Sequence, residues 1–120
     1  MKAIVAGGRD YKWNAKDYLL LHEIVVEYSI DEIVSGMATG IDSMGIKYAY
    51  ENDIKLHEYP AEWGKYGRAA GPIRNGYMAY YSDMLIVWPG GSGTKNMIKQ
   101  AKEAGIGIIE VNNGKANKIQ

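Results

Sequence analysis

The sequence predicts an α/β fold in which helices cover both faces of a mostly parallel sheet of about five strands, giving three layers. Short continuous apolar runs alternate with stretches of helical periodicity along the chain, and parallel strands need such helical crossovers. In addition, three glycine-rich turns each follow an apolar run. This places the three turns at the carboxyl edge of the sheet, where open parallel sheets bind their ligands.

Each element is assigned from the spacing of its apolar residues. Continuous apolar runs predict buried strands, whereas apolar residues three and four positions apart predict helices. Pro72 follows Gly71 and is well placed to open a helix. In chain order, the predicted elements are a strand at 2–6, a helix at about 14–28, a strand at 31–35, a helix at about 41–52, a strand at 55–59, a helix at about 72–81, a strand at 83–88, a helix at about 93–104 and a strand at 106–111.

One stretch, residues 60–71, fits neither pattern. It combines aromatic rings, cations and three glycines, and it is longer than most connectors between elements. We interpret it as a binding loop that lies over the strand edge.

The composition indicates one domain without a strong charge. With 120 residues, the chain is long enough to bury a core of its own, so one domain at 1–120 is expected, with a polar end at 112–120 that frays. Fourteen basic and fourteen acidic side chains cancel, so nucleic acid is not an expected partner and any anion site is local. No apolar run approaches the ~20 residues of a membrane span, and a cytoplasmic protein without a membrane partner is expected.

The residue types present limit the possible chemistry. The chain has no cysteine, which excludes disulfides, thiolate catalysis and cysteine zinc sites. His22 lies within the apolar period of the first predicted helix and His57 within a strand, and both are expected to pack or to form hydrogen bonds. We therefore predict neither a metal site nor a cofactor.

The most informative motif is the turn Pro89-Gly90-Gly91-Ser92-Gly93-Thr94, which lies between a predicted strand and a predicted helix. Glycines at such a junction leave backbone N–H groups unshielded and let an anion approach the helix N-terminus. Gly7-Gly8-Arg9 and the turn from Gly36 to Gly40, which includes Thr39, follow apolar runs in the same way. We interpret the three turns as one phosphate-binding site. A purely structural role in tight turns is the alternative.

Two standard nucleotide-binding motifs do not fit this turn. A dinucleotide fingerprint requires a third glycine where this chain has Asn96. In a Walker A loop the lysine precedes the hydroxyl residue, whereas Lys95 follows Thr94 here. The turn at 89–94 is therefore interpreted as a general phosphate-binding loop.

Two groups of charged and polar residues are expected near the phosphate. Arg74 falls in the first turn of a predicted helix, with Asn75 beside it and Arg68 upstream, and a guanidinium suits bidentate phosphate recognition. Arg9 and Asp10 follow the first strand, where a charged pair would face the ligand. The alternatives are a surface arginine that caps loop carbonyls and a salt bridge between loop residues.

Two carboxylates and two aromatic rings complete the candidate site. Asp42 lies at the start of the second predicted helix and Glu62 in the irregular stretch. Together they would supply the acid and the base that glycosidic bond cleavage requires, although Asp42 is also explained by its favourable interaction with the helix dipole. Trp63 and Tyr66 would stack on a nucleobase, or else pack the loop onto the core.

A larger pattern is formed by Arg74-Asn75, Met78, Asp83 and the turn from Pro89 to Thr94. This pattern resembles the SLOG superfamily, a group of Rossmann-like proteins that includes the Lonely Guy phosphoribohydrolases and DNA processing protein A. The resemblance extends to other segments, which are similar to the small YspA-like branch common in bacteria and their phages: Gly8-Arg9-Asp10, Gly36 to Asp42, and Ala61 to Asn75. It covers nearly the whole chain and implies a Rossmann-like fold.

The resemblance also implies a nucleotide-derived ligand, such as an ADP-ribose-like compound or a nucleoside phosphate. By position, the motif from Gly90 to Thr94 would hold its phosphate, and Arg74 matches the arginine that Lonely Guy enzymes use at the ribose phosphate. Those enzymes carry a glutamate three residues after the threonine of their glycine motif. Here that position is Met97.

Three functions are compatible with the turns and with the resemblance. Without the glutamate, the favoured function is to bind, sense or sequester the ligand. The first alternative is an N-glycosidase in which Arg74 orients the phosphate and Asp42 or Glu62 acts on the glycosidic bond. The second, which the DNA-processing members of the superfamily suggest and the neutral net charge disfavours, is single-stranded DNA binding with Trp63 and Tyr66 as stacking faces and with these basic residues: Lys65, Arg68, Arg74 and Lys95. Because Lonely Guy proteins are commonly dimers, the resemblance also implies a homodimer or higher homo-oligomer.

Overall fold

The computed structural model describes residues 1–120 and has a single six-stranded sheet at its centre. The strand order is β3-β2-β1-β4-β5-β6. The first five strands are parallel to one another, and β6 pairs with β5 in the antiparallel direction. The strands are β1 (Lys2–Ala6), β2 (Glu32–Ser35), β3 (Lys55–Glu58), β4 (Met84–Val87), β5 (Gly107–Asn112) and β6 (Lys115–Lys118).

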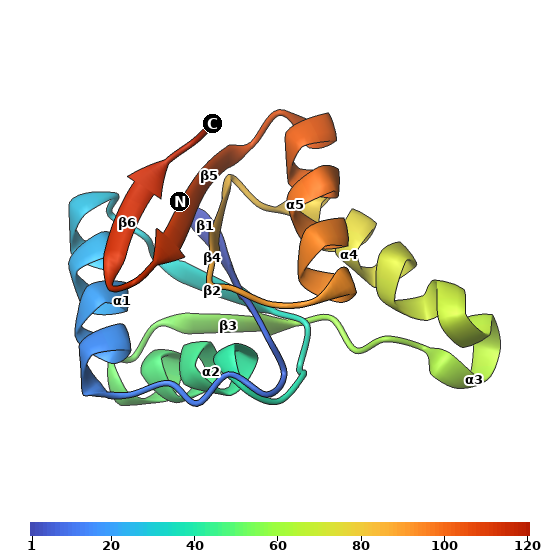
Figure 1. The fold of residues 1–120 in the computed structure, drawn as a ribbon, viewed down its shortest axis with the longest axis horizontal. Helices are drawn as coiled ribbons and strands as arrows, with labels where there is room; N and C mark the ends of the chain where they lie inside the picture. The colour runs from blue at the N-terminus through green and yellow to red at the C-terminus, as the bar shows by residue number, and fades with distance from the viewer.

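Helices cover both faces of the sheet, so the predicted three-layer Rossmann-like fold is confirmed (Figure 1). Helices α1 and α2 pack on one face around a core of 16 buried residues, and α4 and α5 pack on the other around a core of 10. The helices are α1 (Ala15–Glu27), α2 (Ile41–Glu51), α3 (Trp63–Tyr66), α4 (Ala70–Tyr81) and α5 (Ser92–Ala104), with a 3₁₀ turn, η1, at Gly67–Ala69.

The helices differ in how their N-termini are capped. At the start of α1, the Asn14 side chain accepts a hydrogen bond from the Asp17 N–H, and the Asp17 carboxylate accepts one from the Asn14 N–H. This capping box satisfies donors that the helix itself leaves free. By contrast, α2 begins after Gly40 and α5 after Gly91, and neither glycine has a side chain to provide such a cap. Helices α3 and α4 also lack a side-chain cap, so α1 is the one helix whose N-terminus a side chain caps.

The expectation that residues 112–120 fray is wrong. Lys115–Lys118 form β6, in register from Ile109 opposite Lys118 to Asn112 opposite Lys115. The Gln120 side chain also donates to the carbonyls of Ala101 and Ile106. The free edge of β5 thus supplies hydrogen-bond partners to a polar segment that has no apolar run of its own.

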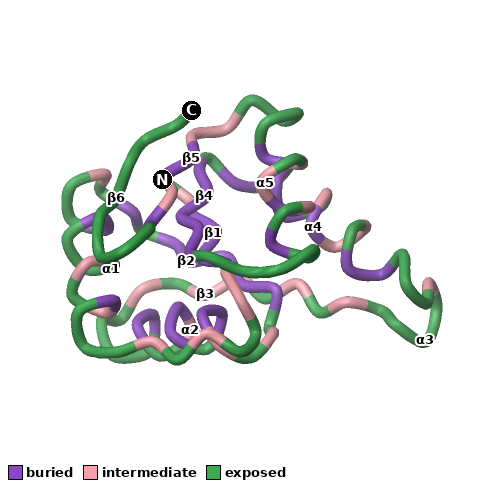
Figure 2. Tube along the Cα trace, viewed as in Figure 1, coloured by how far each residue is buried: buried purple, intermediate pink, exposed green.

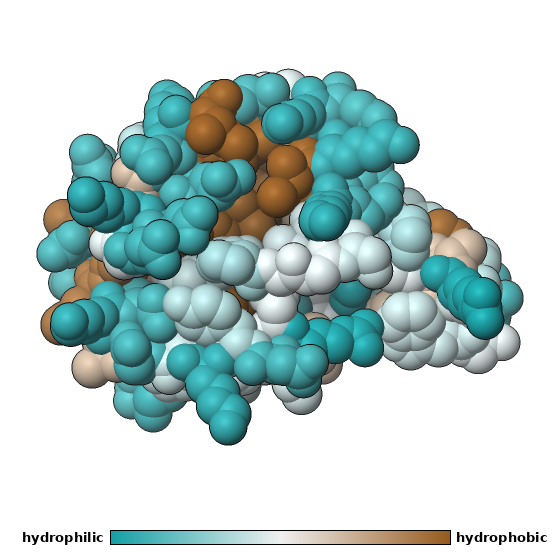
Figure 3. Space-filling model, in the orientation of Figure 1, coloured by the Kyte–Doolittle hydropathy of each residue, from teal (hydrophilic) through white to brown (hydrophobic).

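The irregular stretch at 60–71 is more regular than predicted. It contains α3 and η1, and α4 begins at Ala70 rather than at Pro72, so the proline lies inside the first helical turn. This segment forms a lobe at one end of the molecule, where most residues are exposed (Figure 2). The space-filling view shows the lobe set apart from a larger body whose visible surface is mostly hydrophilic (Figure 3).

None of the helices combines the length and the apolar character that crossing a membrane requires.

Candidate functional site

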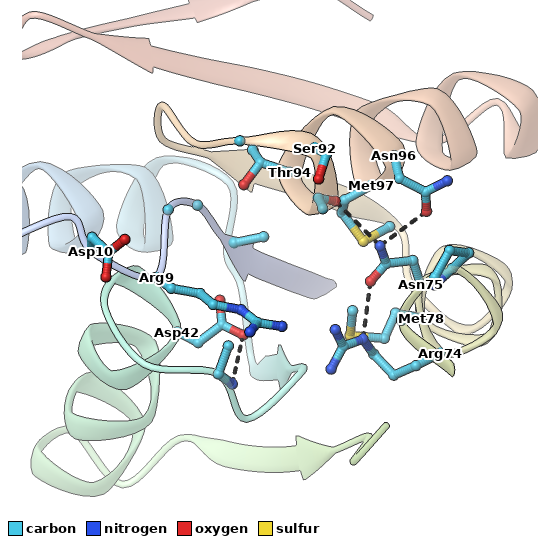
Figure 4. A pocket seen from close by; sticks show the side chains of 18 of the residues that line it. Arg9, Asp10, Asp42, Arg74, Asn75, Met78, Ser92, Thr94, Asn96 and Met97 are labelled. Carbon is cyan, nitrogen blue, oxygen red and sulfur yellow. Dashed lines mark hydrogen bonds between the residues drawn. The ribbon is translucent and has the colours of Figure 1, made fainter. Parts of the chain in front are cut away.

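A cleft of about 700 Å³ lies at the carboxyl ends of the strands. Strand β1 is at the point where the connections reverse direction, since β2 and β3 lie on one side of it and β4 and β5 on the other, which is where ligands bind in such sheets. The cleft is walled by the turn after β1 and the start of α2 on one side and by α4 and α5 on the other (Figure 4). Twelve of the predicted site residues line it: Gly8, Arg9, Asp10, Asp42, Trp63, Arg68, Arg74, Asn75, Gly91, Ser92, Gly93 and Thr94.

Three glycines pack the three turns against one another. A Cβ atom on Gly40, whose φ is +68°, would lie 2.1 Å from the Gly8 carbonyl oxygen. A Cβ on Gly90 would lie 2.1 Å from the Thr94 hydroxyl and 2.7 Å from the Gly8 nitrogen. The Gly8 N–H in turn donates to the Pro89 carbonyl over 2.9 Å. At these positions glycine is needed for close approach of backbone to backbone, which is the structural role left open by the sequence.

Two further glycines keep the start of α5 open. Neither Gly91 nor Gly93 has an atom within 4 Å of the position that a Cβ would occupy. No side chain caps this helix, and its first turn contains no acidic residue. The first backbone hydrogen bond of the helix runs from the Lys95 N–H to the Gly91 carbonyl, so the preceding N–H groups are left without helical partners. Residues 91–94 line the cleft, so the positive end of the helix dipole lies at the cleft.

Arg74 is held in place by the chain around it. Its Nη1 donates to the Gly36 carbonyl, and its Nε donates to Asn75 Oδ1 over 3.0 Å. A Cβ on Gly36 would lie 2.7 Å from the guanidinium, so Gly36 gives this side chain its space. Asn75 is fixed by bonds from its Nδ2 to Asn96 Oδ1, at 3.0 Å, and to the Gly93 carbonyl, at 3.4 Å. Burial lowers the pKa of the Arg74 guanidinium, while Asp42 acts in the opposite direction.

Asp42 is a buried carboxyl in the wall of the cleft, with 6% of its surface exposed. Its Oδ2 accepts a hydrogen bond from the Ala38 N–H over 3.1 Å, while its Oδ1 has no hydrogen-bond partner in the protein. Burial raises the pKa of Asp42 to about 6, against the lowering effects of the Ala38 bond and of the charges on Arg74 and Arg9. A carboxyl that titrates near neutral pH in a cleft is suited to proton transfer.

An aromatic ring and two more cations complete the cleft. Trp63 is half-exposed, and the Arg9 guanidinium lies 5.9 Å from the centroid of its ring. The ring also packs over the start of α4, at 3.4 Å from the Cβ position of Gly71. With Arg68, three guanidinium groups line the cleft against the two carboxyls of Asp10 and Asp42. Arg9 and Arg74 extend into the same space from opposite walls (Figure 4).

Six predicted site residues do not line the cleft. Glu62 is exposed just before α3, so the structure does not bring it together with Asp42 in the cleft. Tyr66 lies beneath Lys65, whose Nζ is 5.1 Å from the ring centroid. The other four residues support the turns. Thr39 donates a hydrogen bond to the Arg9 carbonyl over 3.1 Å. The three glycines allow close approach because they have no side chain: Gly36, Gly40 and Gly90.

Sequence reasoning did not assign Met78 and Asn96 to the cleft, although both line it. Met78 follows Arg74 by four residues, and Asn96 follows Ser92 by four. Residues four apart share a helix face, so the spacing from Arg74 and Ser92 could have placed Met78 and Asn96 in the cleft. The histidines lie elsewhere: the His22 ring is 2.7 Å from the Tyr48 hydroxyl, and His57 stacks on Tyr59.

Comparisons with known proteins show a shared fold. No family model matches the chain, and no curated protein matches it. Among solved structures, DNA processing protein A from Streptococcus pneumoniae superposes with a TM-score of 0.72 and 20% sequence identity over 94% of this chain. The match spans about half of that protein's chain, 52%. Since that protein belongs to the group that the motifs resemble, the resemblance is confirmed at the level of the fold, and this chain has the Rossmann-like architecture of DNA processing protein A over almost all of its length.

Proposed function

We propose that the protein binds a nucleotide-derived small molecule, such as an ADP-ribose-like compound or a nucleoside phosphate, with a phosphate at the start of α5. The observation that carries this proposal is the uncapped N-terminus of α5, where Gly91 and Gly93 leave the backbone open toward the cleft. Free N–H groups and a helix dipole favour an anion at this position. The absence of an acidic residue from the first turn leaves that field uncompensated.

The other residues of the cleft fit the remaining parts of such a ligand. Arg74 still has an unused Nη2, since its Nε and Nη1 donate to the protein, and it lies in the cleft with Arg9 and Arg68. Guanidinium groups bind phosphate oxygens through directed hydrogen bonds. The half-exposed ring of Trp63 offers a face on which a base stacks, and the free Oδ1 of Asp42 can form a hydrogen bond with a sugar hydroxyl, which both donates and accepts.

Binding is tested by incubating the purified protein with nucleoside monophosphates, ADP-ribose and NAD, and by measuring retained ligand by mass spectrometry and affinity by calorimetry. Arg74→Ala is expected to weaken binding by about 10- to 100-fold, because a charge-assisted hydrogen bond contributes about 1.5–3 kcal/mol. Lys99→Ala, at an exposed position of α5 outside the cleft, is the matched control and should bind like the parent. A parent protein that retains none of these compounds would contradict the proposal.

An N-glycosidase is the second candidate, and the observation that favours it is the buried Asp42 carboxyl in the cleft. Met97, at the position of the family glutamate, is buried and also lines the cleft, so a carboxyl from α2 would have to replace one from α5. The test is release of free base from nucleoside phosphates. Asp42→Asn should abolish release, whereas Glu62→Gln should not, because Glu62 lies outside the cleft.

Nucleic acid stays a possible partner to be tested, because a protein named for processing DNA shares this fold. The comparison therefore does not support the expectation that nucleic acid is not a partner. Fluorescence anisotropy with a labelled single-stranded oligonucleotide decides the matter. Affinity that falls steeply with salt concentration would indicate contacts to many phosphates, whereas the small-molecule proposal expects weak binding at every salt concentration.

A further inference from the structure

Asp42 lies among charged side chains, and a bound anion would alter the electric field that they exert on its carboxyl. Arg9, from the turn after β1, and Arg74, from α4, both exert their positive field on its carboxyl. Asp10 lines the same cleft, and the turn after β2 supplies the Ala38 N–H. Neither histidine lines the cleft. Among these groups, Asp42 is the one that combines deep burial with an oxygen free of protein hydrogen bonds.

An anion in the cleft acts on Asp42 in two ways. It attracts the guanidinium groups of Arg9 and Arg74, which line the cleft from opposite walls. The anion thereby weakens the positive field that favours the ionised form of the Asp42 carboxyl. It also brings its own negative charge near a buried carboxylate, in surroundings that screen charges poorly. Both effects favour the neutral carboxylic acid. The neutral acid can in addition donate a hydrogen bond to a ligand oxygen, which the carboxylate cannot.

We propose that the cleft takes up a proton together with its anionic ligand, and that the Asp42 carboxyl holds this proton. The inference rests on the proposed function, since it concerns the same cleft, and it adds a protonation step to the binding reaction. Arginine does not deprotonate in proteins, so the guanidinium groups cannot be the source or the acceptor of the proton.

The direction of the pH dependence follows from linkage. The pKa of Asp42 without ligand is about 6, and the bound anion raises it further. Affinity is therefore constant at pH values below the ligand-free pKa, where the acid is already neutral, and falls as the pH rises through the interval between the two pKa values. The total loss is about tenfold for each unit that separates them.

The experiment is isothermal titration calorimetry with ADP-ribose as the probe. Its phosphates stay ionised across the pH range of the measurement, so proton exchange reports on the protein. Titrations at one pH near 7, in buffers of different ionisation enthalpy, give the number of protons taken up on binding. A second set of titrations, at pH values below and above the ligand-free pKa of Asp42, gives the dependence of affinity on pH. The parent protein is expected to take up a measurable fraction of one proton and to bind more weakly as the pH rises.

Asp42→Asn removes the titrating group while keeping an oxygen that can accept the Ala38 N–H. It is expected to bind ADP-ribose without proton uptake and with an affinity independent of pH. His57→Gln, outside the cleft, is the matched control and should retain the uptake. Binding by the parent without proton exchange, or uptake that persists in Asp42→Asn, overturns this inference alone. Absence of binding by the parent to every nucleotide tested overturns the proposed function, and this inference with it.

Discussion

The buried Asp42 carboxyl lowers the stability of the folded protein at neutral pH. Burial raises its pKa from the usual 3.8 to about 6. The neutral acid costs the folded protein nothing below about pH 4, and the free energy of unfolding falls as the pH rises from about 4 to about 6, because the buried group must then ionise. A shift of about two units corresponds to about 3 kcal/mol. We predict that Asp42→Asn is more stable than the parent by up to about this amount at pH 7, in urea unfolding, and that the difference disappears near pH 4. An equal difference at both pH values would contradict this assignment.

At Gly90, one added methyl group is predicted to destabilise the protein. A Cβ there would lie 2.1 Å from the Thr94 hydroxyl, and overpacking of this kind costs about 1–3 kcal/mol. Gly93→Ala is the matched control, because nothing lies within 4 Å of its Cβ position and alanine is the better helix former. Thermal unfolding should show a lower midpoint for Gly90→Ala and an unchanged or higher one for Gly93→Ala.

At the residue scale, the sequence predicted which residue types gather at the sheet edge better than it predicted what each one does. Arg74 and Asp42 were expected in the site, and both line the cleft. Glu62 was paired with Asp42, but position along the chain does not give a distance in space, and a lobe residue can point away. Glycine is ambiguous for a physical reason: the same lack of a side chain serves close packing at Gly90 and open backbone at Gly91.

At the element scale, an acidic side chain at the uncapped start of α5 would stabilise the helix but repel a bound anion. An acidic side chain in the first turn of a helix interacts favourably with the dipole, by about 0.3–1 kcal/mol. We therefore predict that Ser92→Asp raises the free energy of unfolding by about this amount and weakens binding of ADP-ribose. Ser92→Asn is the neutral control and should change binding less. An aspartate variant that binds as tightly as the parent would place the ligand phosphate elsewhere.

Strand β6 provides a test of the largest difference between the predicted and the observed elements. If residues 115–118 are paired with β5 as in the structure, the amide hydrogens of this segment that point toward β5 exchange slowly, whereas the alternate ones face solvent. The amide of Ile119, which donates to the Ile108 carbonyl over 2.8 Å, should also be protected. Hydrogen exchange followed by mass spectrometry measures this directly. Exchange of the C-terminal peptide at the rate of an unfolded chain would instead support the frayed end that its polar sequence predicts.

The central strands of the parallel part, β1, β2 and β4, were predictable because they are buried on both faces and have mostly apolar sequences. Residues Met84–Val87, for example, are buried throughout. By contrast, β6 is exposed along its whole length and gains its hydrogen bonds from β5 rather than from its own pattern. The start of α4 was placed two residues late for a related reason: Pro72 is compatible with any position in the first turn, where its missing N–H has no helical partner.

At the scale of the whole molecule, self-association stays a prediction. The structure offers a surface for it on α4, where Tyr77 and Tyr80 are exposed, Tyr80 by 92%. Neighbouring exposed aromatic rings are typical of interaction surfaces. We predict that the 13.3 kDa chain sediments as a dimer and that Tyr80→Arg shifts it toward the monomer. Sedimentation velocity at several concentrations is the measurement, and a parent that sediments as a monomer at all of them would contradict the prediction.

The glycine contacts between the three turns have a consequence for how chains of this fold can diverge. Because Gly40 and Gly90 both pack against the Gly8 turn, an insertion in any of the three loops would disturb these contacts, and we expect their lengths to be held constant during evolution. Residues 63–69 of the lobe are under no such restraint, since none of them is buried. It contributes Trp63 and Arg68 to the cleft, so mutation of the lobe can alter which ligand is preferred while the fold is inherited unchanged.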